Sequence, residues 1–272
     1  MGEAFETLAV TERVGVAGDR AFLGTSALLF TASAAGTLFW CGSMSGGMPM
    51  PGGWTMSMAW MRMPGQTWPG AAASFMGMWL VMMVAMMLPS LVPMLSSFRR
   101  SARGTDEDRL DGLTALVGAG YFFAWVLVGA AAYPLGVALG AAEMRWSALA
   151  RSVPFVTGVV ILLAGCVQFT AWKARQLRHC RDVPGCGCEM PLEARIAWRH
   201  GLRLGAHCAS CCSGFMAILL VAGVMDLGVM AVVAAAITVE RLAPRPASAA
   251  RATGMAAVVA GVFSIVRALG TV

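Results

Sequence analysis

The chain has 272 residues, of which 58% are apolar and only 12% are charged, and its mean hydropathy is +0.71. A soluble domain carries about twice that share of charged residues, so the composition excludes an ordinary soluble protein. It predicts a single integral membrane domain, all-α, folded as a polytopic transmembrane helical bundle. The formal net charge of +6 requires no nucleic-acid partner, because basic loops on one side of a bilayer account for it.

The long apolar runs predict seven membrane spans. One helix needs about 20 apolar residues to cross a bilayer, and residues 204–240 are about twice that length, with Asp226 between Gly223 and Gly228 near their middle. Two glycines around an aspartate indicate a tight turn, which predicts a helical hairpin of two short spans. One long tilted helix is the alternative, with six crossings. The expected spans are 21–40, 73–95, 113–139, 153–172, 204–223, 226–241 and 253–270.

Lysine and arginine predict the orientation. With seven spans, the N-terminal segment and the loops after the second, fourth and sixth spans hold 16 of the 20 basic residues. The opposite loops hold three, Arg62, Arg145 and Arg151. Positive loops favour the cytoplasm, so we expect the N-terminus inside and the C-terminus outside. With six spans, 13 basic residues would still lie inside.

Methionine is concentrated in one zone, since 14 of the 21 methionines lie between residues 44 and 94. The outer loop after the first span holds three Met-x-Met pairs within 16 residues. A thioether is a soft, uncharged ligand that suits Cu(I) and survives in an oxidising compartment, where a free thiol tends to be oxidised. This methionine-rich loop predicts metal contact. Its candidate ligands are Met48, Met50, Met56, Met58, Met61 and Met63.

The second span continues the methionine series as two neighbouring helical stripes. Met83 and Met87 lie on one stripe and are further candidate ligands. Core packing is the alternative, because methionine fills irregular gaps between helices. Pro89 and Pro93 near the inner end would free backbone carbonyl groups.

Six of the eight cysteines and all three histidines lie between residues 179 and 212. By the predicted orientation this cysteine cluster is cytoplasmic, where thiols stay reduced, so disulfides are not expected. Nearby basic residues favour thiolates, which bind Cu(I), zinc or another thiophilic metal. Small apolar packing is the alternative for the cysteines of the fifth span. The candidate ligands are His179, Cys180, Cys186, Cys188, His207, Cys208, Cys211 and Cys212.

Three other residues are notable. Cys41 lies alone near the outer face, and the sequence offers it no obvious partner there. Asp226 lies at the predicted hairpin turn and Glu240 at the inner end of the sixth span. Ionisable residues in membrane segments are functional candidates by default, but both are expected near an interface, which favours capping or topology roles.

Three segments together resemble a known family: Met82–Ser90, Gln168–Lys173 followed by Cys180, and Gly205–Cys212 with the later Gly223–Leu227 and Glu240. Over roughly residues 55–245 the chain resembles the bacterial predicted metal-binding integral membrane proteins, a domain of unknown function. The resemblance implies a multi-pass protein of the inner (cytoplasmic) membrane with proposed, sometimes copper-related, metal binding and no established reaction. The chain departs from the family pattern at Ser213, where an aromatic is common, and at Asp226, where an amide is common.

These features predict soft-metal handling, with Cu(I) bound, transferred or delivered between the outer methionine-rich loop and the inner Cys/His cluster. Weak thioether capture outside and tighter thiolate binding inside would favour inward metal transport without ATP, and no phosphate-binding loop occurs. The same residues would serve a metallochaperone. The expected partners are the lipid bilayer, the metal ion, and a metalloenzyme or soluble metallochaperone.

Two other functions remain open at this point. One is a structural or assembly subunit of a membrane complex, and the other is an electron-transfer subunit with haem or a metal cluster. No catalytic set of side chains is evident, so an enzyme is not expected. Metal identity, the direction of transfer and the oligomeric state are left open by the sequence.

Overall fold

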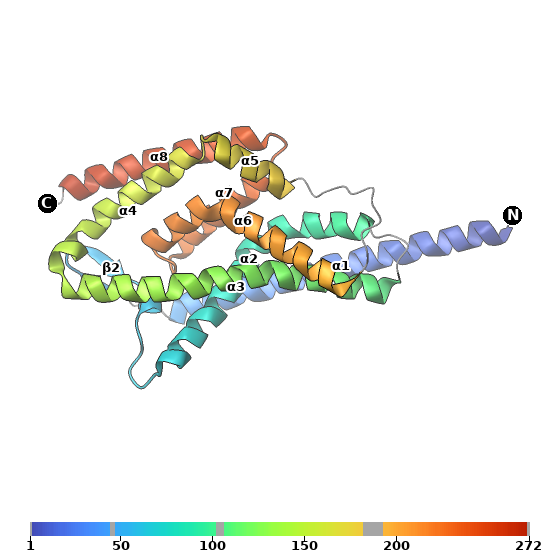
Figure 1. Cartoon of the computed structure of the whole chain (residues 1–272), viewed down its shortest axis with the longest axis horizontal. Coiled ribbons are helices and arrows are strands. Elements are labelled where there is room, and N and C mark those ends of the chain that lie inside the picture. The colour runs from blue at the N-terminus through green and yellow to red at the C-terminus, as the bar shows by residue number, and fades with distance from the viewer. Residues whose placement is uncertain (1, 44–46, 102–105, 182–192, 271–272) are drawn as a thin grey trace.

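The computed structural model describes residues 2–43, 47–101, 106–181 and 193–270, with side chains from 18 to 177 and from 193 onward within those ranges. Over these residues the chain forms eight α-helices and one small antiparallel hairpin (Figure 1). The helices are α1 (Gly2–Ser43), α2 (Trp68–Ser101), α3 (Glu107–Arg145), α4 (Ser147–Val167), α5 (Ala171–Arg181), α6 (Ala194–Ala222), α7 (Leu227–Leu242) and α8 (Pro246–Gly270). The strands are β1 (Met48–Met50) and β2 (Trp54–Met56), and the 3-10 turn η1 (Met58–Trp60) follows them.

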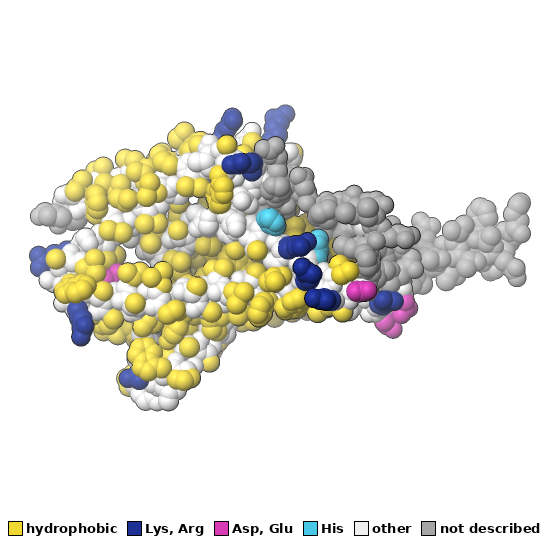
Figure 2. Space-filling model, in the orientation of Figure 1, with side chains coloured by type: hydrophobic (Ala, Val, Ile, Leu, Met, Phe, Trp, Pro, Cys, Tyr) yellow, Lys and Arg dark blue, Asp and Glu magenta, His cyan; other side chains and the backbone are white. Residues whose placement is uncertain are grey.

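Among the described residues, six helices are long and apolar enough to cross a membrane. These are α1 from Gly18 onward, α2, α3, α4, α6 and α8. In the face shown in Figure 2, hydrophobic side chains cover the middle of the molecule, and Lys and Arg side chains lie toward its two ends. The prediction of an all-α polytopic bundle is confirmed, and the chain is a multi-pass membrane protein.

The predicted helical hairpin is present. Helix α6 ends at Ala222, and Gly223 follows with a φ of +125°, a conformation that glycine adopts without steric cost. Asp226 then caps α7, because its carboxylate accepts a hydrogen bond of 2.9 Å from the Val229 amide. The expected capping role of Asp226 is confirmed, and the alternative of one long helix is wrong. The 16-residue α7 is shorter than the six candidate spans, so the count of seven crossings stays a prediction.

The segment between α4 and α6 differs from its prediction as a loop. Helix α4 ends at Val167, and α5 starts at Ala171. The Thr170 hydroxyl accepts a hydrogen bond of 3.2 Å from the Lys173 amide, which caps the start of α5. Helix α6 begins at Ala194, ten residues before its expected start. The basic residues of these segments lie on helices that continue beyond the apolar part of each span. Hydropathy alone therefore misplaces the first and last residues of these helices.

Helices α3 and α6 pack at glycines. A Cβ atom on Gly201 would lie 2.1 Å from the Val117 carbonyl oxygen, and one on Gly205 would lie 2.5 Å from the Tyr121 carbonyl oxygen. Small residues allow such close backbone approach between membrane helices. This contact sets the position of the middle of α6, where its cysteines lie, against α3.

The substitution Gly201→Ala is expected to destabilise the protein by about 1–3 kcal/mol, because the added Cβ would force α3 and α6 apart. The matched control is Gly118→Ala on α3, where a Cβ would have no neighbour within 4 Å. That control should be neutral or slightly stabilising, since alanine favours helix. Melting temperatures in detergent measure both changes. Equal stability of the two variants would contradict the close packing.

The core gathers around the buried face of α2, which packs against α3 and α7. Met82, Met83, Met86 and Met87 are all buried there. Trp79, one turn earlier, donates a hydrogen bond of 2.9 Å from its indole nitrogen to the Trp125 carbonyl of α3. This buried face also meets the cysteines of α6.

Candidate metal centre

Three cysteine thiols and one thioether meet in the buried interior. Cys208, Cys211 and Cys212 lie on α6 and are each at most 3% exposed. The Cys208 sulfur lies 4.0 Å from the sulfur of Cys212, one helical turn later, and 4.0 Å from the sulfur of Met87 on α2. Cys211 lies within side-chain hydrogen-bonding reach of Cys212. The centre therefore joins two helices that are far apart in the sequence.

The sulfur spacing fits a shared metal ion. With metal–thiolate bonds of about 2.3 Å, two sulfurs that share an ion lie no more than about 4.6 Å apart. Both contacts of Cys208 meet that limit. Within the described part of the chain, no group of three or more His, Cys, Asp and Glu side chains could hold a metal ion. A set of two thiolates with a thioether is soft and of low coordination number, which suits Cu(I) better than a hard cation.

Tyr121 of α3 adds a polar contact that the sequence did not predict. Its side chain is fully buried, and its hydroxyl donates a hydrogen bond of 2.9 Å to the Cys208 sulfur. Hydrogen bonds to a ligand atom orient it and tune its basicity. No local motif marks this tyrosine, because its partner is 87 residues away in the chain.

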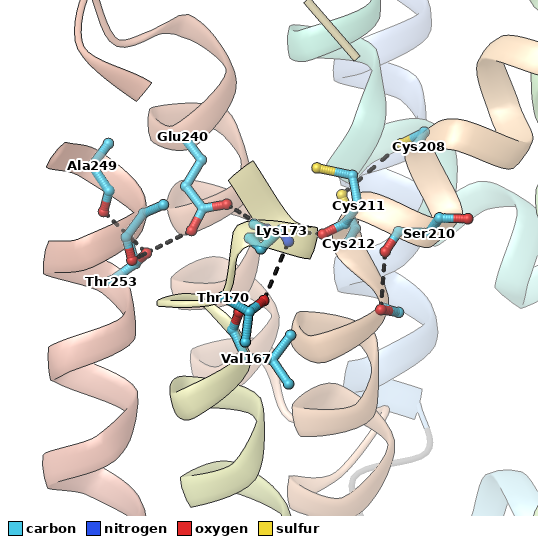
Figure 3. Close-up of polar contacts among 12 residues, drawn as sticks. Val167, Thr170, Lys173, Cys208, Ser210, Cys211, Cys212, Glu240, Ala249 and Thr253 are labelled. Carbon is cyan, nitrogen blue, oxygen red and sulfur yellow. Dashed lines mark hydrogen bonds and ion pairs between the residues drawn. The ribbon is translucent and has the colours of Figure 1, made fainter. Parts of the chain in front are cut away.

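A buried ion pair lies beside the cysteine turn. Lys173 of α5 and Glu240 of α7 are 2.7 Å apart and almost fully buried (Figure 3). The Lys173 ammonium also donates a hydrogen bond of 2.8 Å to the Cys211 carbonyl oxygen. Thr253 of α8 donates one of 2.6 Å to the other oxygen of Glu240. Packing of α5, α7 and α8 encloses the Glu240 carboxylate inside the bundle, and its place near the inner interface stays a prediction.

The next residue, Arg241, connects to the α2 side of the centre, where Met87 lies. Its guanidinium donates a hydrogen bond of 2.9 Å to the Ser90 hydroxyl, which donates one of 2.9 Å to the Met87 carbonyl oxygen. Adjacent residues at the end of α7 therefore connect to both sulfur-bearing helices. Glu240 connects through Lys173 to the backbone of α6, and Arg241 through Ser90 to the backbone of α2.

The structure does not show the other predicted ligands of the cysteine cluster beside these three thiols. His207 is exposed on α6, so the structure does not bring its imidazole into the buried space of the three thiols. Cys186 and Cys188 lie outside the described residues. His179 and Cys180 belong to α5, but their side chains are outside the described ones.

The methionine-rich loop after α1 forms a small hairpin. Met48 pairs with Met56 across β1 and β2, and Met50 pairs with Trp54. Met56 is buried against Gly140 of α3, and the Trp54 indole donates a hydrogen bond of 2.8 Å to a carbonyl at the start of α4. These two side chains hold the loop to the bundle, so part of the predicted ligand set serves packing.

The remaining candidate methionines vary in exposure. Met48 and Met63 are exposed at 37% and 42%, and Met50, Met58 and Met61 are half-buried. Met83 is fully buried on α2, one turn before Met87. The structure therefore presents some loop thioethers at the surface and keeps those of α2 inside.

Cys41 has a partner that the sequence did not indicate. Its sulfur lies 3.9 Å from the sulfur of Met225, in the turn between α6 and α7. Cys41 is buried and Met225 is half-buried. The two residues are 184 positions apart, so only the fold could pair them. This second sulfur contact lies at the hairpin turn, away from the cysteines in the middle of α6.

A model of the PpoB2 family, described as a copper chaperone, matches residues 76–264. The chain belongs to the PpoB2 copper chaperone family. The matched segment contains α2 from Met76 onward, all of α6, Tyr121 and the Glu240–Arg241 pair, and it starts after the methionine hairpin. No curated protein and no solved structure matches the chain. PpoB2 membership makes the function copper-related, and it agrees with the metal-binding family that the sequence resembles.

Proposed function

We propose that the protein binds copper as Cu(I) within the membrane, between Cys208, Cys212 and Met87, and delivers it to a partner without catalysing a reaction of its own. The observation that carries this proposal is the pair of 4.0 Å sulfur contacts that meet at Cys208. Two thiolates and a thioether match the ligand preference of Cu(I). Membership of a copper chaperone family supports the choice of metal.

The ion reaches this centre from the outer methionines. Helices α1 and α2 run side by side, with Gly36 next to Val81 and Trp40 next to Gly77. This register sets the end of α1 level with the first turns of α2, where Met76 lies about 16 Å along the helix from Met87. Buried methionines occupy the intervening face of α2, at Met78, Met82, Met83 and Met86.

A gradient of ligand strength drives the transfer. Uncharged thioethers on the hairpin and along α2 hold Cu(I) weakly, and the thiolates on α6 hold it more tightly. The ion therefore moves toward the cysteines without ATP. From there it passes to a metalloenzyme or a soluble metallochaperone whose own thiolates or imidazoles compete for it.

Metal analysis of the detergent-purified protein tests the proposal. Protein from cells grown with added copper should retain about one Cu(I) per chain at the sulfur centre. X-ray absorption should report sulfur neighbours around the ion. Copper-free protein that cannot be loaded with Cu(I), or a haem or cluster absorbance in the purified protein, would contradict the proposal.

Leucine in place of Met48, Met50, Met56 and Met58 should slow copper uptake by cells while purified protein still retains Cu(I). The reason is that the hairpin supplies capture ligands and the α6 cysteines supply the tight site. Uptake rate and retained copper are measured on the same variant. The control replaces Met144 and Met255, which are exposed on α3 and α8, by leucine. Unchanged uptake by the hairpin variant would exclude the loop from the route.

A further inference from the structure

Three arginines form a row on the surface of α6, in the first half of the helix. Arg195, Arg199 and Arg203 follow one another at intervals of four residues, which places them on adjoining parts of one helix surface, and all three are exposed. In Figure 2, Lys and Arg side chains gather over this end of α6, beside His side chains. These three residues, which we call the arginine row, carry three positive charges on an outer surface of the molecule.

The charge of the arginine row is not compensated by neighbouring residues. Helix α6 contains no aspartate or glutamate. Within the part of the chain that the structure describes, none of the three arginines forms an ion pair or a side-chain hydrogen bond. On α3, which packs against α6, Asp111 is paired with Arg99 of α2. A row of like charges without counter-charges attracts a partner of the opposite charge.

The arginine row lies close to the proposed copper site along the helix. Cys208 follows Arg203 by five residues, which is a rise of about 7.5 Å. The two positions that continue the four-residue spacing are His207 and then Cys211. A protein bound to the row therefore has its contact surface next to the segment of α6 that holds the thiols. Such a contact brings an acceptor to the ion and occupies none of the sulfur ligands.

The length of the arginine row favours a protein partner over lipid headgroups. Arg195 and Arg203 are eight residues apart, which is about 12 Å along the helix axis. The two headgroup layers add about 10–15 Å to a hydrocarbon core of about 30 Å, so each layer is about 5–8 Å thick. A helix that crosses the bilayer carries the three arginines at different depths, and one headgroup layer is too thin to contact them all. A folded protein surface is long enough to do so.

We propose that the arginine row is the docking surface for the soluble protein that receives copper, and that this acceptor carries aspartate or glutamate side chains beside its copper-binding thiols. The inference rests on the proposed function, because it takes the cysteines of α6 as the place from which copper leaves. Charge complementarity acts mainly on the rate of association. The row therefore accelerates transfer to an acidic acceptor and leaves the retention of copper unchanged.

Transfer of Cu(I) from the detergent-purified full chain to two synthetic peptides tests the proposal. Both peptides contain the same Cys-x-x-Cys pair, and the flanking positions hold glutamate in one peptide and glutamine in the other. At low ionic strength the acidic peptide should receive copper about tenfold faster or more, because opposite charges raise encounter rates by about 10- to 1,000-fold. In about 1 M salt this preference should disappear, since the Debye length is then about 3 Å.

The variant Arg195→Gln/Arg199→Gln/Arg203→Gln should lose the preference for the acidic peptide. Its transfer rate to both peptides should equal the rate of the parent with the neutral peptide, and its retention of Cu(I) should match that of the parent. Melting temperature in detergent checks the fold. Arg199→Gln alone should lose part of the preference, and it decides if the triple variant does not fold.

A matched control removes the same charge from other exposed positions. Arg100→Gln/Arg245→Gln/Arg251→Gln changes the end of α2, the turn before α8 and the first turns of α8. The seven-span prediction assigns these positions to the same side of the membrane as the arginine row. This control should keep the preference for the acidic peptide. Equal loss of preference in the two triple variants would reduce the effect to net charge and overturn the inference.

Two further outcomes are decisive. Equal transfer to both peptides by the parent at low ionic strength would overturn the inference and leave the copper site in place, whereas a parent that binds no Cu(I) would overturn the proposed function as well. Nanodiscs of phosphatidylcholine alone are compared with nanodiscs of an equimolar mixture of phosphatidylcholine and phosphatidylglycerol. The preference should persist in both. A preference that anionic lipid abolishes would assign the row to headgroups and overturn the inference.

Discussion

Replacing both Cys208 and Cys212 with serine is expected to abolish tight Cu(I) binding, with a loss of affinity of more than about 100-fold. Loss of a residue that only supports a ligand costs about 10- to 100-fold, and removal of two ligands should cost more. A hydroxyl is a hard donor that Cu(I) binds poorly. The fold should survive, because serine is similar in size and can still accept the Tyr121 hydrogen bond.

Chelator competition on detergent-purified protein measures this loss, and melting temperature checks the fold. Cys166→Ser is the control, since Cys166 is exposed on α4. Cys211→Ser alone should have a smaller effect than either Cys208→Ser or Cys212→Ser. Retention of Cu(I) by the double variant with an affinity near that of the parent would remove these thiols from the site.

Breaking the buried ion pair is the second large expected effect. Lys173→Met or Glu240→Gln should destabilise the protein by about 3–5 kcal/mol, because each leaves one charge buried without its partner. Lys173→Met also removes the hydrogen bond to the Cys211 carbonyl, so it should loosen the cysteine turn as well. Both effects appear as a lower melting temperature in detergent.

The double variant Lys173→Met/Glu240→Met distinguishes an ion pair from a simple packing contact. Replacement of a buried ion pair by apolar residues is often close to neutral, so the double variant should be more stable than either single variant. Arg175→Met, at an exposed position two residues along α5, is the control. Additive losses in the double variant would show that the two charges do not interact.

Most of the bundle follows from local patterns in the sequence. Apolar runs identified α2 and α3 because a span must satisfy its backbone internally and bury few charges. Gly223 and Asp226 revealed the hairpin turn, since a positive φ and a helix cap require particular residue types. Helix α5 was missed because its residues are polar and its stability comes from packing on α6 and α7.

The site was predicted only in part, because many of its contacts join residues that are far apart in the sequence. The four-residue spacing of Cys208 and Cys212 is visible in the sequence, but their approach to Met87 depends on how α2 and α6 pack. The same spacing made His207 a candidate, yet its direction on α6 leaves it exposed. The sequence did carry a signal for the Lys173–Glu240 ion pair. A charged residue lies near the end of one span, and a residue of opposite charge lies near the end of another.

The length of α7 has a consequence for the membrane around it. Sixteen residues of helix rise about 24 Å, against a hydrocarbon thickness of about 30 Å. Lipids adapt to such hydrophobic mismatch by thinning around the shorter element. If α7 crosses the bilayer as the sequence predicts, the headgroup layer dips toward the turn between α7 and α8, and a docking protein would approach the proposed copper site beneath a shallow depression instead of a full leaflet.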